Sequence, residues 1–168
     1  MTPDEALARI EQAAGAAGMQ PVRVTLGSGR PALAGRTSEF RWRWMATRLH
    51  TFLVAAPFPP GTGPAELDAF IGEATRYAKD NKGGLPRGLQ TGVAALVVAV
   101  TSGASPAAVE WASEVHGRQF ATIPWPVLVD TASGTVTQPQ KMKLGGVYKA
   151  YLQEMVRNVV VVADGGRS

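Results

Sequence analysis

The chain has 168 residues, of which 45% are apolar and 18% charged, a composition typical of an ordinary globular protein that argues against extended disorder. Lys and Arg number 17 against 13 Asp and Glu, and the resulting net charge of +4 permits anionic partners without requiring them. Cysteine is absent, which excludes disulfides, thiolate nucleophiles and sulfur-ligated zinc sites.

The first residues, MTPDEALARIEQAAG, carry acids where a signal peptide carries basic residues. The longest apolar runs of the chain are also far shorter than a bilayer-spanning helix. We therefore expect no membrane span and a cytoplasmic location.

The N-terminal third predicts a helix followed by strands. Thr2-Pro3-Asp4-Glu5 has the signature of a helix start, and Gly18 is expected to end that helix. Residues 21–26 alternate apolar and polar side chains, as in a half-buried strand. The stretch 27–38, GSGRPALAGRTS, has the composition of a loop.

Residues 39–56 are the most informative β-type region. In FRWRW, residues 40–44, rings alternate with arginines, so a strand would place rings on one face and guanidinium groups on the other. The sequence leaves open whether this region is one long bent strand or a hairpin that turns near residues 47–48, because no Gly, Asn or Pro marks the turn.

The remaining elements follow from helical stripes and apolar runs. We expect a helix from Pro64 to Gly83, a buried strand over 93–100 and a helix from Pro106 to Gly117. One face of this last helix would carry Ala108, Trp111, Ala112 and Val115. A strand over 123–130 with a partner at 134–138 and a helix over 144–155 would follow. The prediction is a single α/β domain over residues 1–168, bordering on α+β. It has four helices, a mixed sheet of about five strands including a parallel crossover around 94–129, and a loose tail from about residue 163.

One candidate ligand site is the glycine-rich segment GGLPRGLQTG, residues 83–92. Its backbone N–H groups could bind an anion, and the candidate ligand-binding residues are Gly84, Arg87, Gly88 and Gln90, converging with Arg118 or His50. The alternative is a tight helix-to-strand connection in which Gly83 ends the helix and Pro86 fixes a turn.

The arginines of the β-type region suggest a second site. Arg41, Arg43 and Arg48 could form a basic strand face for nucleic acid. Strict alternation, however, separates the rings from the cations, so Trp42 and Trp44 are expected in the core.

Other residue patterns do not point to catalysis. His50 and His116 are in no metal-ligand spacing, and no nucleophile motif accompanies them, so we expect no catalytic residue, metal or cofactor. Asp130 ends a strand, where it either serves function or opens a turn.

The order of elements is similar to that of the restriction-endonuclease-like fold. Members of that family hold magnesium on acidic residues and a lysine of adjacent strands. The corresponding strands here carry no Asp and no Glu-x-Lys triplet, but instead Glu39, Arg41, Arg43, Arg48 and His50. The sequence therefore does not place the chain in that family.

The function expected first is that of a non-catalytic domain that acts through protein–protein contacts or self-association. Trp111, Trp125 and the tyrosines of the last helix would supply the contact area. The alternatives are binding, or an enzymatic reaction, of an anionic small molecule at the 83–92 segment, and nucleic-acid binding through the basic strand face.

Overall fold

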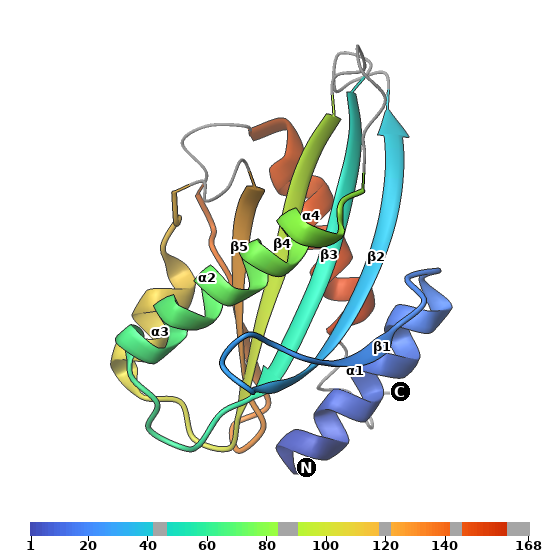
Figure 1. Cartoon of the computed structure of the whole chain (residues 1–168). Helices are drawn as coiled ribbons and strands as arrows, with labels where there is room; N and C mark the ends of the chain where they lie inside the picture. The colour runs from blue at the N-terminus through green and yellow to red at the C-terminus, as the bar shows by residue number, and fades with distance from the viewer. Residues whose placement is uncertain (42–46, 84–90, 118–121, 142–145, 161–168) are drawn as a thin grey trace, which may run out of the picture.

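The computed structural model describes residues 1–41, 47–83, 91–117, 122–141 and 146–160. In chain order its elements are α1 (Pro3–Ala16), β1 (Val22–Thr25), β2 (Pro31–Arg41), β3 (Thr47–Pro57), α2 (Pro64–Asn81), β4 (Thr91–Thr101), α3 (Pro106–Ser113), β5 (Thr122–Asp130), β6 (Thr135–Thr137) and α4 (Gly146–Val159). Within these ranges six strands form one sheet in the order β1-β2-β3-β4-β5-β6, with helices on both faces (Figure 1). The predicted α/β class with a mixed sheet is confirmed.

The directions of the strands place several strand ends together. β1, β2 and β3 form an antiparallel meander, β3, β4 and β5 are parallel, and β6 is antiparallel to β5. The parallel pairing of β4 with β5 across α3 confirms the predicted crossover. The amino ends of β3, β4 and β5 consequently lie at one end of the sheet, together with the carboxyl end of β2 (Figure 1).

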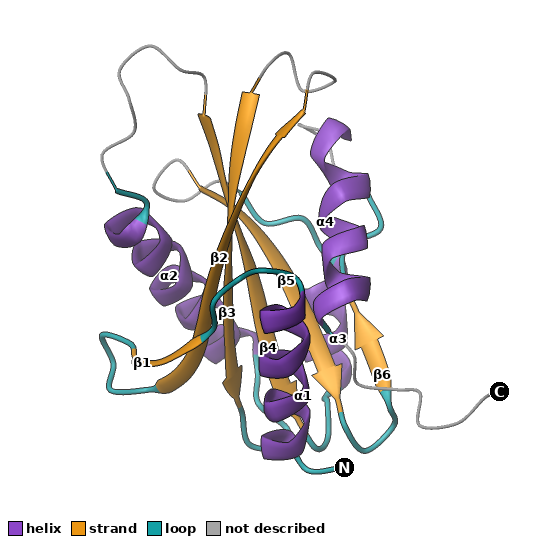
Figure 2. Cartoon of the chain, turned by 90° about the vertical axis from the view of Figure 1, so that its right-hand side faces the viewer, coloured by secondary structure: helices purple, strands orange, loops and turns teal. Residues whose placement is uncertain are grey.

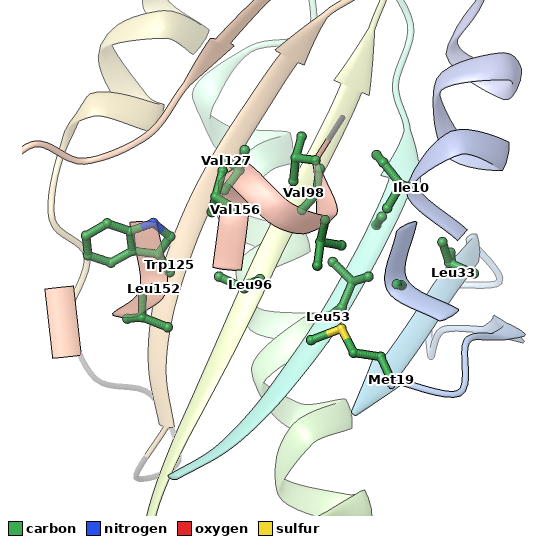
Figure 3. Packing of buried hydrophobic residues seen from close by; sticks show 14 of the residues in the cluster. Ile10, Met19, Leu33, Leu53, Leu96, Val98, Trp125, Val127, Leu152 and Val156 are labelled. Atoms are coloured by element: carbon green, nitrogen blue, oxygen red, sulfur yellow. The ribbon is translucent and has the colours of Figure 1, made fainter. Parts of the chain in front are cut away.

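The helices cover the sheet in pairs. α1 and α4 lie on one face, and α2 and α3 lie on the other (Figure 2). Alternation along β3 divides its side chains between the two layers: Leu49 joins the core under α1 and α4, whereas Phe52 and Val54 join the core under α2 and α3. Figure 3 shows the first core, in which Leu152 of α4 packs beside Trp125 of β5.

The central strand, β4, is buried on both faces. Every residue from Val93 to Val100 is 5% exposed or less. A strand covered by helices on both sides needs apolar residues at consecutive positions, because neither face meets water. This explains why its sequence, VAALVVAV, is an unbroken apolar run.

Local signals at several helix ends act as predicted. Thr2 and Glu5 form a capping box at the start of α1. Gly18 and Gly83, which follow α1 and α2, have φ of +81° and +72°, a conformation that glycine adopts without a steric penalty. Ser105 Oγ accepts a hydrogen bond of 3.1 Å from a backbone N–H in the first turn of α3.

Helix α3 is shorter than expected. It ends at Ser113 rather than at Gly117, and the next residue has extended backbone. The Trp111 carbonyl accepts a hydrogen bond of 3.3 Å from the Glu114 backbone N–H and also lies 3.0 Å from His116 Nε2, so groups beyond the helix satisfy this terminal carbonyl. Val115 lies outside the helix and is 45% exposed, so its expected place on the buried face is wrong.

The loop expected over residues 27–38 is wrong from residue 31 onwards, because β2 begins at Pro31. β2 is paired with β1 on one side and β3 on the other, and these two hydrogen-bonded ladders outweigh the weak β-propensity of its Ala and Gly residues. At Gly35 the backbone passes close to Met19, whose Cβ would lie 3.2 Å from a Cβ at position 35, a tight contact that a larger residue would have to relax.

The open question about residues 39–56 is answered by a hairpin-like pairing. β2 and β3 are antiparallel, with Arg41 opposite Thr47.

Two predictions fall outside the described residues. The interpretations of Arg43, Trp42 and Trp44 concern residues 42–46, and the predicted loose tail begins at about residue 163. Within the described ranges, no helix combines the length and apolar character needed to cross a bilayer.

Candidate functional site

The side chain of His50, on β3, is a buried polar group without a partner. It is 6% exposed, and among the described residues neither Nδ1 nor Nε2 has a hydrogen-bond partner. The other buried atom of this kind, Arg30 Nε, lies 3.7 Å from a carboxylate oxygen of Glu73. An unsatisfied buried polar group costs about 1–3 kcal/mol of stability. Packing in an apolar core does not offset this cost, so the burial of His50 calls for a functional explanation.

The register of the sheet identifies the neighbours of His50. It shares the α2 face of the sheet with Phe52, two residues further along β3. Ser38 of β2 lies directly opposite it on one side, and Val93 of β4 on the other. Arg48 precedes it by two residues, which places the two Cα atoms about 7 Å apart on the same face.

Two exposed arginines lie beside the buried imidazole. Arg48 Nη1 donates a hydrogen bond of 3.0 Å to Ser38 Oγ. Arg36, two residues before Ser38 on β2, donates from Nη1 to the backbone carbonyl of Asn81 at the end of α2, also at 3.0 Å. We call Arg36, Ser38, Arg48 and His50 the basic patch.

The charge state of His50 follows from this environment. Burial lowers the pKa of the imidazole below its ordinary value of 6.5, because the charged form loses its hydration. Arg36 and then Arg48 lower that pKa further by charge repulsion. The imidazole is therefore neutral at neutral pH and carries one N–H donor and one acceptor.

The basic patch lies at the end of the sheet where the amino ends of β3, β4 and β5 meet. α2 crosses the sheet obliquely, and β2, β3 and β4 continue past its last turn (Figure 1). The glycine-rich segment begins and ends beside the patch. Gly83 follows the end of α2, whose Asn81 carbonyl accepts from Arg36, and Thr91 lies beside Arg48 in the β3–β4 register.

Of the ligand-binding residues predicted from sequence, His50 is described at this site. Gly84, Arg87, Gly88, Gln90 and Arg118 lie outside the described residues.

Of the residues predicted for nucleic-acid binding, Arg48 joins His50 in the patch. Arg41 closes β2 and Arg43 is outside the described residues. Sequence reasoning missed Arg36 and Ser38, which fell in the segment interpreted as a loop. Assigning that segment to a strand would have placed them on one face by alternation.

The arrangement does not supply a formed catalytic pair. Ser38 is opposite His50, but its Oγ accepts from Arg48, and the imidazole nitrogens make no bond to it. In the part of the chain that the structure describes, no three His, Asp or Glu side chains are grouped to hold a metal ion. Two cations beside a neutral, unpartnered imidazole are instead suited to binding an anion.

His116, the other histidine, has a structural role. Its ring contacts the Trp111 carbonyl on one side and Asp68 on the other, where Asp68 Oδ1 lies 3.9 Å from His116 Nδ1. The same Asp68 oxygen accepts a hydrogen bond of 2.9 Å from Trp111 Nε1. These contacts join α3 to α2.

Asp130, at the carboxyl end of β5, is explained by the turn that follows it. Its carboxylate accepts from the backbone N–H groups of Ala132, at 3.0 Å, and Ala104, at 3.3 Å. Desolvation opposes ionisation of Asp130, but these bonds and those from Ser133 outweigh it and lower the pKa of the carboxyl group. The turn interpretation of Asp130 is therefore sufficient.

Comparison of the chain with protein-family models, with curated proteins and with solved structures found no match. A function for this chain therefore has to come from its own residues.

Proposed function

We propose that the chain binds a small anion, bearing a phosphate or a carboxylate group, at the basic patch. The observation that carries this proposal is His50, a buried imidazole beside two exposed arginines, whose two nitrogens have no partner in the described part of the chain. An anion bound by both exposed guanidinium groups would offset the positive charge around His50. It would also satisfy the buried imidazole N–H once the side chains that cover this atom move aside.

The two arginines retain the capacity to bind such a ligand. Each donates one bond to an uncharged oxygen, that of Ser38 or of Asn81, while a guanidinium group has five N–H donors. Among the described residues, no carboxylate forms a salt bridge with Arg36 or Arg48. The anion would therefore not have to displace a charged partner.

Protein–protein contact, the function expected first from the sequence, stays a prediction. The two tryptophans named for it are buried in the monomer, at 4% exposed for Trp111 and 1% for Trp125. Their indole N–H groups bond to Asp68 and Gln138. Neither ring therefore offers contact area on the surface of the folded chain.

The test is an NMR titration of the 15N-labelled protein with inorganic phosphate, combined with calorimetry. We expect the His50 ring signals and the amides of β2 and β3 around it to shift. Arg48→Gln and His50→Gln are each expected to weaken binding by about tenfold or more. Arg157→Gln is the matched control, because Arg157 is an exposed arginine of α4, on the opposite face of the sheet. This variant should bind phosphate like the wild type.

Three results would overturn the proposal. One is the absence of shifts with millimolar phosphate, sulfate or citrate, which would mean that solvent alone satisfies His50. A second is equal binding by all three variants. A third is salt-sensitive binding of a single-stranded oligonucleotide in the absence of any response to small anions, which would favour nucleic acid instead.

A further inference from the structure

A groove opens directly beside Arg36. Its volume is about 440 Å³, and it is lined by Met19, Gln20, Val22, Ala34, Gly35, Arg36, Phe52, Tyr77 and Asn81. The α1–β1 connection, β2, β3 and the last turns of α2 thus all contribute to it. This volume is in the range of sites that hold small organic molecules.

The lining of this groove has one charge, that of Arg36, and two aromatic residues, Phe52 and Tyr77. Phe52 and Tyr77 meet edge to face, with ring centroids 6.4 Å apart and planes at 85°. The Arg36 guanidinium lies 5.7 Å from the centroid of the Phe52 ring. Phe52 is 1% exposed, so a ligand in the groove would meet the Arg36 cation at one end and the half-buried Tyr77 ring beside it.

The groove and the basic patch are connected through Arg36. This residue acts on His50 electrostatically, lines the groove, and holds the Asn81 carbonyl that also borders it. A second groove of about 680 Å³ continues along α2 and shares Tyr77 and Asn81 with the first. The available space therefore exceeds what an inorganic anion occupies.

We propose that the ligand is an organic anion whose charged group lies at Arg36, near His50, and whose uncharged, ring-bearing body lies in the groove against Tyr77. This inference rests on the proposed anion-binding function and specifies its ligand class. A ring buried in such a groove gains apolar contact that inorganic phosphate does not make.

The test compares two probes with the same headgroup, inorganic phosphate and phenyl phosphate, by calorimetry. We expect phenyl phosphate to bind at least about tenfold more tightly. Tyr77→Ala should reduce that ratio towards one, while Tyr77→Phe, which keeps the ring, should preserve it. Tyr148→Ala, on α4 and the opposite face, is the control for removing a tyrosine and should leave the ratio unchanged.

Amide shifts of the wild-type protein give a second measurement that does not depend on whether Tyr77→Ala folds. Phenyl phosphate should shift Gln20, Val22 and Tyr77, and inorganic phosphate should not. Phosphate binding without tighter binding of phenyl phosphate, or without the groove shifts, would overturn this inference and leave the proposed function standing. If neither probe binds, the proposed function and this inference both fail.

Discussion

Ser38 and His50 lie directly opposite each other in the antiparallel β2–β3 register, yet the Ser38 hydroxyl accepts a hydrogen bond from Arg48, and no described residue bonds to the imidazole. Buried polar side chains are ordinarily hydrogen-bonded, and Ser38 is the polar side chain directly across the ladder from His50. Here the Ser38 hydroxyl is used by the arginine, and the buried imidazole nitrogens have no hydrogen-bond partner among the described residues.

We expect the ring of His50 to titrate below 6.5 in the free protein and to shift upwards when phosphate is added. Burial and the charges of Arg36 and Arg48 lower the pKa of the imidazole, and a bound anion offsets both arginines. NMR titration of the His116→Gln variant checks this, because its one imidazole signal belongs to His50. A midpoint at or above 6.5 without phosphate would contradict the expectation.

His50 should also make stability depend on pH. Below pH 6.5 the unfolded chain takes up a proton at this position, while the folded chain does so only nearer its lower pKa. The free energy of unfolding therefore decreases as the pH falls through this window, by at most about 1.4 kcal/mol per pH unit. Urea unfolding of the wild type and of His50→Gln, compared across the window, should show the variant losing less stability.

Gly35→Ala should destabilise the protein by about 1–3 kcal/mol, because the added Cβ would lie 3.2 Å from Met19 Cβ and 3.4 Å from its carbonyl oxygen. Gly27→Ala is the matched control. A Cβ at position 27 meets no atom within 4 Å, and the backbone there needs no glycine conformation. Thermal unfolding of both variants measures the difference, and equal melting temperatures would show that the close approach at Gly35 is relaxed at no cost.

Asp130→Asn should destabilise the folded chain by about 1–2 kcal/mol at neutral pH, because the carboxylate accepts charge-assisted bonds from the N–H groups of Ala104 and Ala132. These bonds keep the pKa of Asp130 below its ordinary value of 3.8, so their contribution is present above that pH and is lost as the pH falls through the lower, folded-state value. Urea unfolding should therefore show the two proteins converging in acid.

Much of the fold was predictable because its signals are local. The Thr2 cap, the glycines after α1 and α2 and the apolar run of β4 each depend on a few neighbouring residues. Residues 31–38 of β2 were missed because their pairing with β1 and β3 is a tertiary effect that outweighs a composition of Ala, Gly and Pro. Half of the basic patch was lost with them, since Arg36 and Ser38 are on that strand. His50 was a sequence candidate, but its missing partners depend on which side chains the folded sheet brings beside it.

The sheet of this protein places its six strands side by side in the order in which they are synthesised. Each strand joins an edge left open by the one before, and none has to be inserted between two that are already paired. A chain leaving the ribosome could therefore extend the sheet one strand at a time, from the N-terminal meander onwards. The β2–β3 pair, which carries the whole basic patch, would then be in place before the second half of the protein exists.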